Sequence, residues 1–125
     1  MGFQQEWFKW VYIMRNVVGI DVSSEWLNWA LVSDEGELID EDVVDNNSYG
    51  LREIEKVIMS YAAEVIFEAT GVYSRRLQRW FEDLDWPYVM LNPLEAKKGM
   101  DSLRKTKTDL IDARKLAELQ IRSPY

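Results

Sequence analysis

The sequence predicts an α/β domain in which a mixed sheet is flanked by helices. Three apolar segments of strand length, at residues 16–22, 26–33 and 38–44, are joined by short links. Beyond residue 47, helical spacing of apolar residues alternates with short, buried-type strands. Hairpins would form the antiparallel part of this sheet, and right-handed crossovers would form its parallel part.

The first three strands are predicted from their apolar composition and from a turn between the second strand and the third. Residues 16–22 (NVVGIDV) and 26–33 (WLNWALVS) are rich in apolar side chains typical of strands. The segment Asp34–Glu37 contains a glycine and predicts a turn into the strand at 38–44. Strands with such short links are expected to form an antiparallel meander.

The first helix is predicted at residues 47–62, where the apolar period changes from two to 3.6. Asn47 and Ser48 are both acceptable N-cap residues. The inward positions at this spacing are Leu51, Ile54, Ile58 and Tyr61.

The second half continues with alternating elements. A strand at 64–68 (EVIFE) leads through Thr70-Gly71 into a helix that ends near Leu84, and a strand at 88–91 follows. The inward positions of that helix are Leu77, Trp80, Phe81 and Leu84. A last helix at 108–121 has one stripe of Ala113, Leu116, Ala117 and Gln120. The order βββαβαβα indicates a ribonuclease H-like arrangement.

Composition limits the chemistry. A chain of 125 residues that is 47% hydrophobic suits one domain with one core. It contains no cysteine and no histidine, so disulfides, thiolate or imidazole metal ligands, and histidine bases are excluded. Carboxylates, hydroxyls, lysine and arginine must carry any reaction. No apolar run approaches the roughly 20 residues of a membrane span, so we expect a soluble, cytoplasmic protein.

The net charge of −7 hides an asymmetry along the chain. Residues 1–96 hold seven basic and 18 acidic residues, whereas residues 97–125 hold eight basic and four acidic ones. The basic residues could form a solvated face or a strip that contacts nucleic-acid phosphates. The residues that would form the strip are Lys97, Lys98, Arg104, Lys105 and Lys107, together with Arg75, Arg76 and Arg79.

Two acids stand out because they interrupt apolar strands. Asp21 lies within VVGIDV and Glu68 ends VIFE, on strands expected to be neighbours. A buried carboxylate without a partner costs several kcal/mol unless it is neutralised or bound to a cation. Simpler explanations are that Asp21 caps the turn at Ser23-Ser24 and that Glu68 lies at a solvated strand end.

Two further acids lie three residues apart in the last predicted helix. Asp109 and Asp112 would share one helix face, although Asp109 could equally be a first-turn acid after a Thr108 cap. If this face lies over the ends of the strands that carry Asp21 and Glu68, four carboxylates converge. Hard oxygen ligands select Mg²⁺ or Mn²⁺, and two such ions could hold the attacking and leaving oxygens of a phosphodiester.

Four motifs in this order resemble one family. GIDVSS at 19–24, EATGVY at 68–73, LNP at 91–93 and KTDLIDARKLAEL at 107–119 are similar to the N-terminal domain of DEDD-type insertion-sequence transposases, relatives of the Piv and MooV DNA invertases. The resemblance covers about residues 17–124. It implies a RuvC-like fold in which Asp21, Glu68, Asp109 and Asp112 bind magnesium.

The resemblance also implies partners and a division into domains. Members are recombinases guided by a bridge RNA, and they act on DNA as tetramers through a second domain that supplies a serine nucleophile. We therefore expect residues 1–15 to be an extension and residues 16–125 to be the RuvC-like domain, with the serine-bearing domain absent. Such a fragment is expected to be inactive, or nearly so, by itself.

Two alternatives from other functional classes stay open. GIDVSS after a strand also resembles the first phosphate loop of actin-like and sugar-kinase-like nucleotide-binding domains, although no second glycine-rich loop appears. A non-catalytic module for nucleic-acid binding or dimerisation would also suit a fragment without a nucleophile. Binding of ATP would favour the first alternative, and retained guide-RNA binding without strand cleavage would favour the second.

Overall fold

The computed structural model describes residues 15–92 and 112–122. In chain order, the elements of these ranges are β1 (Asn16–Val22), β2 (Trp26–Ser33), β3 (Leu38–Asp45), α2 (Ser48–Tyr61), β4 (Glu64–Glu68), the 3₁₀ turn η1 (Gly71–Ser74), α3 (Arg75–Asp83), β5 (Val89–Leu91) and α5 (Ala113–Arg122). The predicted strands 16–22, 26–33 and 64–68 have the observed bounds.

The strands form one mixed sheet in the order β3-β2-β1-β4-β5. The pairs β1–β2 and β2–β3 are antiparallel, as the predicted meander requires. The pairs β1–β4 and β4–β5 are parallel and are reached by helical crossovers. The carboxyl ends of β1 and β4 therefore meet at one edge of the sheet.

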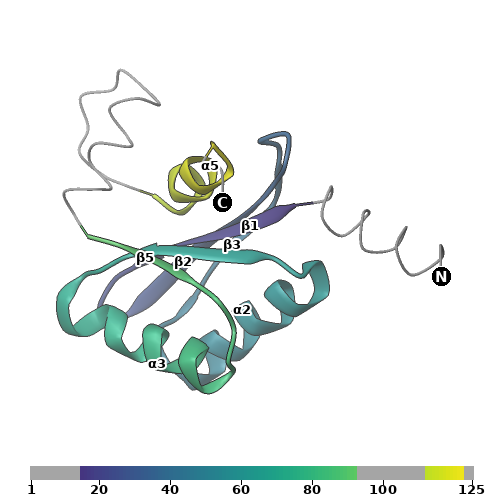
Figure 1. The fold of residues 1–125 in the computed structure, drawn as a ribbon. Helices are drawn as coiled ribbons and strands as arrows, with labels where there is room; N and C mark the ends of the chain where they lie inside the picture. Colours follow the sequence, from purple (N-terminus) through teal and green to yellow (C-terminus); the bar gives the residue numbers. More distant parts are fainter. Residues whose placement is uncertain (1–14, 93–111, 123–125) are drawn as a thin grey trace.

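The sheet separates two layers of helices. In Figure 1, α2 and α3 lie on one face and α5 lies on the other. The larger core lies under α2 and α3 and includes Ile20, Leu31 and Phe67. A smaller core joins Val17 and Ile66 to the apolar stripe of α5. Alternate residues of β1 thus point to opposite helical layers.

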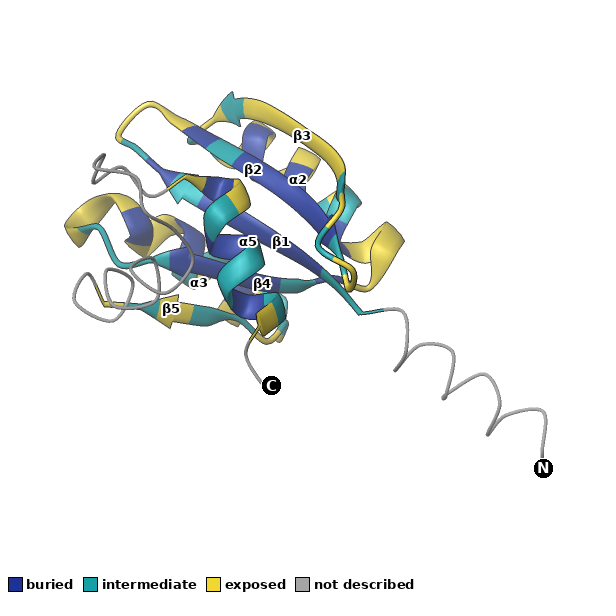
Figure 2. Ribbon diagram, turned by 90° about the horizontal axis from the view of Figure 1, so that it is seen from above, coloured by how far each residue is buried: buried dark blue, intermediate teal, exposed yellow. Residues whose placement is uncertain are grey.

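The central strands are buried, and the β3 edge is exposed. Figure 2 shows β1, β2 and β4 largely in the buried colour, while β3 is mostly exposed. The exposed positions of β3 include Asp40, Glu41 and Asp42. Charged side chains on an edge strand discourage pairing with a further strand from another molecule.

Local capping explains where α2 begins and ends. The Asn47 side chain accepts a hydrogen bond from the Gly50 N–H at 3.0 Å, so Asn47 is the N-cap. At the other end, Ala62 adopts a left-handed conformation with φ 48° and closes the helix. The prediction that Tyr61 points inward is wrong, because its side chain is 43% exposed at this last helical position.

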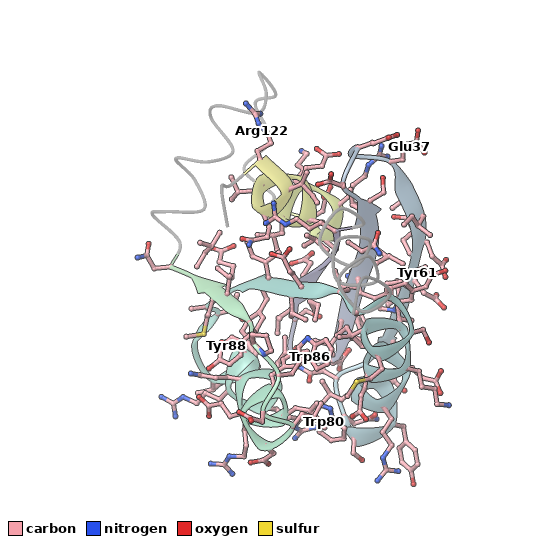
Figure 3. The ribbon with its side chains drawn as sticks, turned by 45° about the vertical axis from the view of Figure 1, so that its right-hand side comes forward. Glu37, Tyr61, Trp80, Trp86, Tyr88 and Arg122 are labelled. Atoms are coloured by element: carbon pink, nitrogen blue, oxygen red, sulfur yellow. The ribbon has the colours of Figure 1, made fainter. Side chains whose placement is uncertain are left out.

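Polar contacts of two tryptophans help to hold the layer of α2 and α3 together and against the sheet. The Trp80 Nε1 donates to Glu55 at 2.9 Å and joins α3 to α2. The Trp86 Nε1 donates to the Ala63 carbonyl at 3.1 Å, next to the start of β4. Both side chains lie beneath the sheet (Figure 3).

No helix among the described residues has the length and apolar character to cross a membrane.

Candidate carboxylate site

Asp21 and Glu68 lie at the carboxyl ends of two paired strands. In the parallel register of β1 and β4, Gly19 is opposite Ile66 and Ile20 is opposite Phe67, so Asp21 comes at the next position, beside Glu68. Gly19 contacts α5 and Ile66 packs with it. Since side chains alternate along a strand, Asp21 and Glu68 share the face that α5 covers.

The electrostatics of these two carboxyl groups are coupled. Burial raises the pKa of Asp21, and the nearby charge of Asp112 raises it further. Burial also raises the pKa of Glu68, and the charge of Asp21 adds to this effect. The charge of Asp112 thus disfavours ionisation of Asp21, and the charge of Asp21 disfavours ionisation of Glu68, although these acids are distant in sequence.

Asp112 reaches this edge as the N-cap of α5. Its Oδ1 accepts a hydrogen bond from the Lys115 N–H at 2.8 Å, and its carbonyl oxygen accepts from the Leu116 N–H at 3.1 Å. The predicted helix at 108–121 was expected to contain Asp112 in its interior. Within the described residues the helix begins at Ala113, because the Asp112 side chain takes the capping position.

The other predicted site residues divide into two groups. Asp109 and the basic residues Lys97, Lys98, Arg104, Lys105 and Lys107 lie outside the described residues. Arg75 and Arg76 lie on α3, directly after η1, and both are exposed. Among residues 15–92 and 112–122, no three acids lie close enough together to form a group that could hold a metal ion.

Arg76 has a contact within the protein that its sequence does not indicate. Its Nη1 donates to the Asn46 carbonyl at 2.8 Å. The Asn46 side chain in turn donates to the Ser23 carbonyl at 2.8 Å, and its backbone N–H donates to the Glu25 carbonyl at 2.9 Å. Asn46 thereby ties the turn that follows Asp21 to the end of β3 and to α3.

An open pocket of about 660 Å³ adjoins the carboxylates on the α5 face. Asp21 and Asp112 line it together with residues of β2, β3 and the first turn of α5. The remaining lining residues are Asn28, Trp29, Glu41, Asp42, Val43, Ala113 and Arg114. Asn28 was missed in the sequence, where it is one polar residue in an apolar strand. Its register position opposite Asp21 was the signal that could have identified it.

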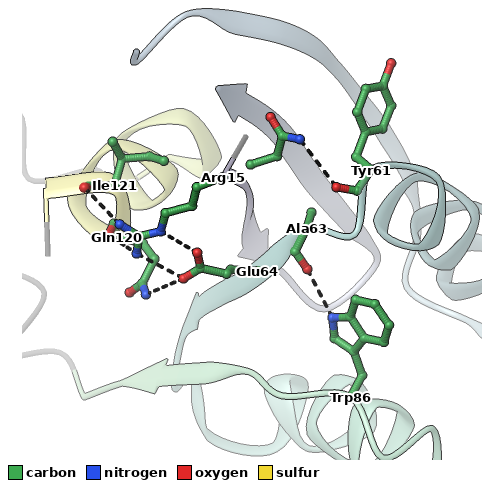
Figure 4. Close-up of polar contacts among 8 residues, drawn as sticks. Arg15, Tyr61, Ala63, Glu64, Trp86, Gln120 and Ile121 are labelled. Carbon is green, nitrogen blue, oxygen red and sulfur yellow. Dashed lines mark hydrogen bonds and ion pairs between the residues drawn. The ribbon is translucent and has the colours of Figure 1, made fainter. Parts of the chain in front are cut away.

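The far end of α5 is fixed by a polar cluster (Figure 4). Arg15 forms an ion pair with Glu64 at the start of β4. The same guanidinium donates to the carbonyl oxygens of Gln120, at 2.9 Å, and Ile121, at 3.2 Å. The Gln120 side chain also donates to Glu64 at 3.1 Å. Arg15, the last residue of the predicted extension, thus caps the carboxyl end of α5.

The donor set suits a hard divalent cation better than any other cofactor. Asp21, Glu68 and Asp112 supply only carboxylate oxygens, which are ligands of Mg²⁺ and Mn²⁺. Burial raises the pKa of both Asp21 and Glu68, and a neighbouring carboxylate raises each further, so a bound cation would offset both effects. These three acids would need a further ligand or a small movement to surround an ion, since they form no ready cluster among the described residues.

Comparison with known proteins identifies similar sequences and folds. A family model described as a transposase, of the DEDD type of the insertion sequence IS110, matches residues 18–124. No curated protein sequence matches the chain. Among solved structures, the chain is similar to T. thermophilus RuvC in complex with a Holliday junction substrate, with a TM-score of 0.57 and 12% identity over 84% of this chain and 91% of RuvC.

Two proteins of the ROK family are also similar. One is a transcriptional regulator homologous to the E. coli MLC protein, with a TM-score of 0.50 and 15% identity over 73% of this chain and 31% of that chain. The other is a hexokinase from Thermus thermophilus, with a TM-score of 0.48 and 14% identity over 69% of this chain and 36% of that chain. At these identities a likeness shows fold alone. The likeness to RuvC confirms the predicted ribonuclease H-like, RuvC-like fold.

Proposed function

Because the chain belongs to the IS110-type family of DEDD transposases, we propose that it supplies the metal-binding carboxylates for DNA strand cleavage and exchange. The proposal depends most on one observation. Asp21 and Glu68 lie side by side at the ends of paired strands, where burial raises the pKa of both, and the charge of Asp112 raises the pKa of Asp21 further as that of Asp21 does for Glu68. Such coupling is characteristic of carboxylates that act together at a functional site.

In this proposal, Asp21, Glu68 and Asp112 hold Mg²⁺ or Mn²⁺, and Asp109 completes the set. The ion would stabilise the negative charge that develops on phosphate oxygens during cleavage. The contribution of the chain itself is positional. Parallel pairing of β1 with β4 sets Asp21 beside Glu68, and the packing of α5 on β1 brings Asp112 to the same edge.

DNA is the proposed substrate. RuvC, which shares the fold, is described in complex with a Holliday junction, a branched DNA. Lys97, Lys98, Arg104, Lys105 and Lys107 are proposed to contact phosphates, as is Arg75, whose side chain is exposed on α3. Guide-RNA binding and assembly into dimers or tetramers of the full-length protein are proposed on the family resemblance alone.

The test is a set of charge-removing substitutions in the full-length transposase. Asp21→Asn, Glu68→Gln and Asp112→Asn should each abolish Mg²⁺-dependent DNA cleavage and recombination while leaving the far-ultraviolet circular dichroism spectrum unchanged. Asp83→Asn is the matched control, because Asp83 is exposed on α3, on the opposite side of the sheet. Normal recombination by Asp21→Asn and Glu68→Gln would refute the proposal.

Metal binding can be measured separately from activity. Titration of the protein with Mn²⁺, followed by calorimetry, should show binding that is weakened at least tenfold by Asp21→Asn and unchanged by Asp83→Asn. Mn²⁺ binding that is insensitive to Asp21, Glu68 and Asp112 would place the ion elsewhere. Guide-RNA binding that persists in a metal-binding protein without any cleavage activity would favour the non-catalytic module instead.

A further inference from the structure

Asn28 lies on β2 directly across from Asp21. In the antiparallel register of β1 and β2, the two residues are partners, so their side chains project from the same face of the sheet. Both line the pocket of about 660 Å³ that also receives Asp112. Asn28 is therefore the uncharged polar neighbour of the carboxylates, contributed by a different strand.

The position of Asn28 within its strand is unusual. It is flanked by Leu27 and Trp29, which are both buried, and asparagine is depleted in strand interiors. Its own side chain is half-buried. A polar amide at such a place loses part of its hydration and gains stability only when it finds a hydrogen-bond partner.

No described residue provides that partner to Asn28. Across residues 15–92 and 112–122, the other buried or half-buried asparagines are bound: Asn16 donates to the Tyr61 carbonyl, Asn46 donates to the Ser23 carbonyl, and Asn47 accepts from Gly50. The Asn28 amide has no such contact and faces the pocket instead. Its two N–H donors are available to a ligand.

The pocket also defines what kind of ligand Asn28 would meet. Four carboxylates line it, from Asp21, Glu41, Asp42 and Asp112. A phosphate entering beside them needs donors that are fixed in place, because carboxylates repel its oxygens. Of the other polar side chains there, Arg114 is exposed and its Nε is bound to Glu118 at 3.2 Å. The amide of Asn28 is a donor carried by a central strand of the sheet, opposite Asp21.

We propose that Asn28 donates a hydrogen bond to a non-bridging oxygen of the phosphodiester that is cleaved. This inference rests on the proposed function, because it assigns to Asn28 the same substrate that the carboxylates act on. A hydrogen bond from a positioned donor strengthens as negative charge develops on the phosphate oxygens, so it would act mainly on kcat. Asn28 is then a specific contact to the substrate and does not bind the metal ion.

The experiment compares Asn28→Leu, Asn28→Ala and Asn28→Gln in the full-length transposase, with Gln78→Leu as the matched control. Gln78 carries the same kind of amide on α3, on the opposite side of the sheet from α5, and does not line the pocket. Loss of one positioned donor should lower kcat about 100-fold in the leucine and alanine variants of Asn28. The glutamine variant, which keeps the amide, should recover part of this loss, and Gln78→Leu should cleave at the wild-type rate.

Mn²⁺ titration and thermal unfolding separate the explanations. Unchanged Mn²⁺ affinity and unfolding temperature in Asn28→Ala, together with the fall in kcat, would support a direct contact with phosphate. Mn²⁺ affinity that falls as far as in Asp21→Asn would make Asn28 a metal ligand and overturn the inference. Wild-type cleavage by Asn28→Ala would also overturn the inference. If Asp21→Asn is inactive in the same experiment, the proposed function still stands. Active Asp21→Asn would overturn both.

Discussion

Gly19 on β1 lies directly against the backbone of Ala113 on α5. A Cβ atom added at Gly19 would be 2.1 Å from the Ala113 carbonyl oxygen and 2.7 Å from the Ala117 backbone nitrogen. Asp112 immediately precedes Ala113, and Asp21 is two residues beyond Gly19 on the same face of β1. This contact of helix with strand therefore controls how near the two acids approach each other.

Gly19→Ala should push α5 away from β1. The atoms that crowd the new methyl group belong to the helix backbone and cannot rotate aside as a flexible side chain would. We expect a loss of about 2 kcal/mol or more in the free energy of unfolding, measured with urea, and weaker Mn²⁺ binding. Gly36→Asn is the comparison, because Gly36 has open space around it, so any loss of stability there comes from its φ of 83° alone and should leave Mn²⁺ binding unchanged. Wild-type stability of Gly19→Ala would contradict the close packing of α5.

Asp21→Asn should stabilise the metal-free protein while it abolishes cleavage. The folded-state pKa values of Asp21 and Glu68 are raised, so the folded protein binds more protons than the unfolded chain at pH values above about 4. The wild type therefore loses stability as the pH rises through this window. An uncharged residue at position 21 removes much of that loss.

The measurement is the unfolding temperature in a chelator between acidic and neutral pH. Asp21→Asn should unfold a few degrees higher than wild type at neutral pH, and the difference should shrink as the pH falls. Added Mg²⁺ should raise the unfolding temperature of the wild type more than that of the variant. A variant that is less stable than wild type at neutral pH would mean that the Asp21 carboxylate is needed for folding.

The sequence predicted the sheet well because apolar runs and turns leave local signals. The strands at 16–22 and 64–68 were placed correctly, and the order of elements made them parallel neighbours. The juxtaposition of Asp21 and Glu68 follows from that pairing, since both acids end strands that run in the same direction. Strand order and direction were thus enough to bring two site residues together.

Contacts made by single polar side chains leave no comparable pattern in the sequence. The predicted helix at 108–121 places Asp112 in its interior, and nothing in the sequence indicates that this side chain caps the helix. The sequence predicts that Arg76 contacts nucleic acid, which stays a prediction, but it does not indicate the bond from the Arg76 guanidinium to the carbonyl of Asn46. Tyr61 fitted the inward stripe of α2, although the helix ends there. Each case depends on geometry at the end of an element.

Arg76→Met should destabilise the protein, whereas Arg75→Met should not. Arg76 joins α3 to the Asn46 carbonyl, and methionine keeps much of the side-chain length without the donor. We expect a loss of about 1 kcal/mol in the free energy of unfolding for Arg76→Met. Arg75 is an exposed neighbour on the same helix and is the matched control. Its substitution should instead weaken DNA binding by the full-length protein, with a smaller salt dependence of the affinity. Equal stability of the two variants would show that the Asn46 contact contributes little.

Glu64→Gln should destabilise the protein in a pH-dependent way. Burial works to raise the pKa of Glu64, but the hydrogen bonds from Arg15 and Gln120 and the charge of Arg15 outweigh it, so the pKa is lowered. The carboxylate therefore stabilises the fold at pH values above the ordinary glutamate pKa of about 4.3, and this contribution disappears as the pH falls through the folded-state pKa. Because more than a third of the Glu64 side chain is exposed, we expect a loss of only about 1 kcal/mol at neutral pH.

Glu53→Gln provides the comparison for the Glu64 substitution. Glu53 pairs with Lys56 at 3.4 Å on the surface of α2, where both side chains are largely exposed, so its removal should change the free energy of unfolding by less than about 0.5 kcal/mol at every pH. Urea unfolding of both variants between neutral pH and about pH 3 separates the two pairs. If the loss in Glu64→Gln persisted unchanged at the acidic end, the stabilisation would come from packing and not from the charge that ties Arg15 and the end of α5 to β4.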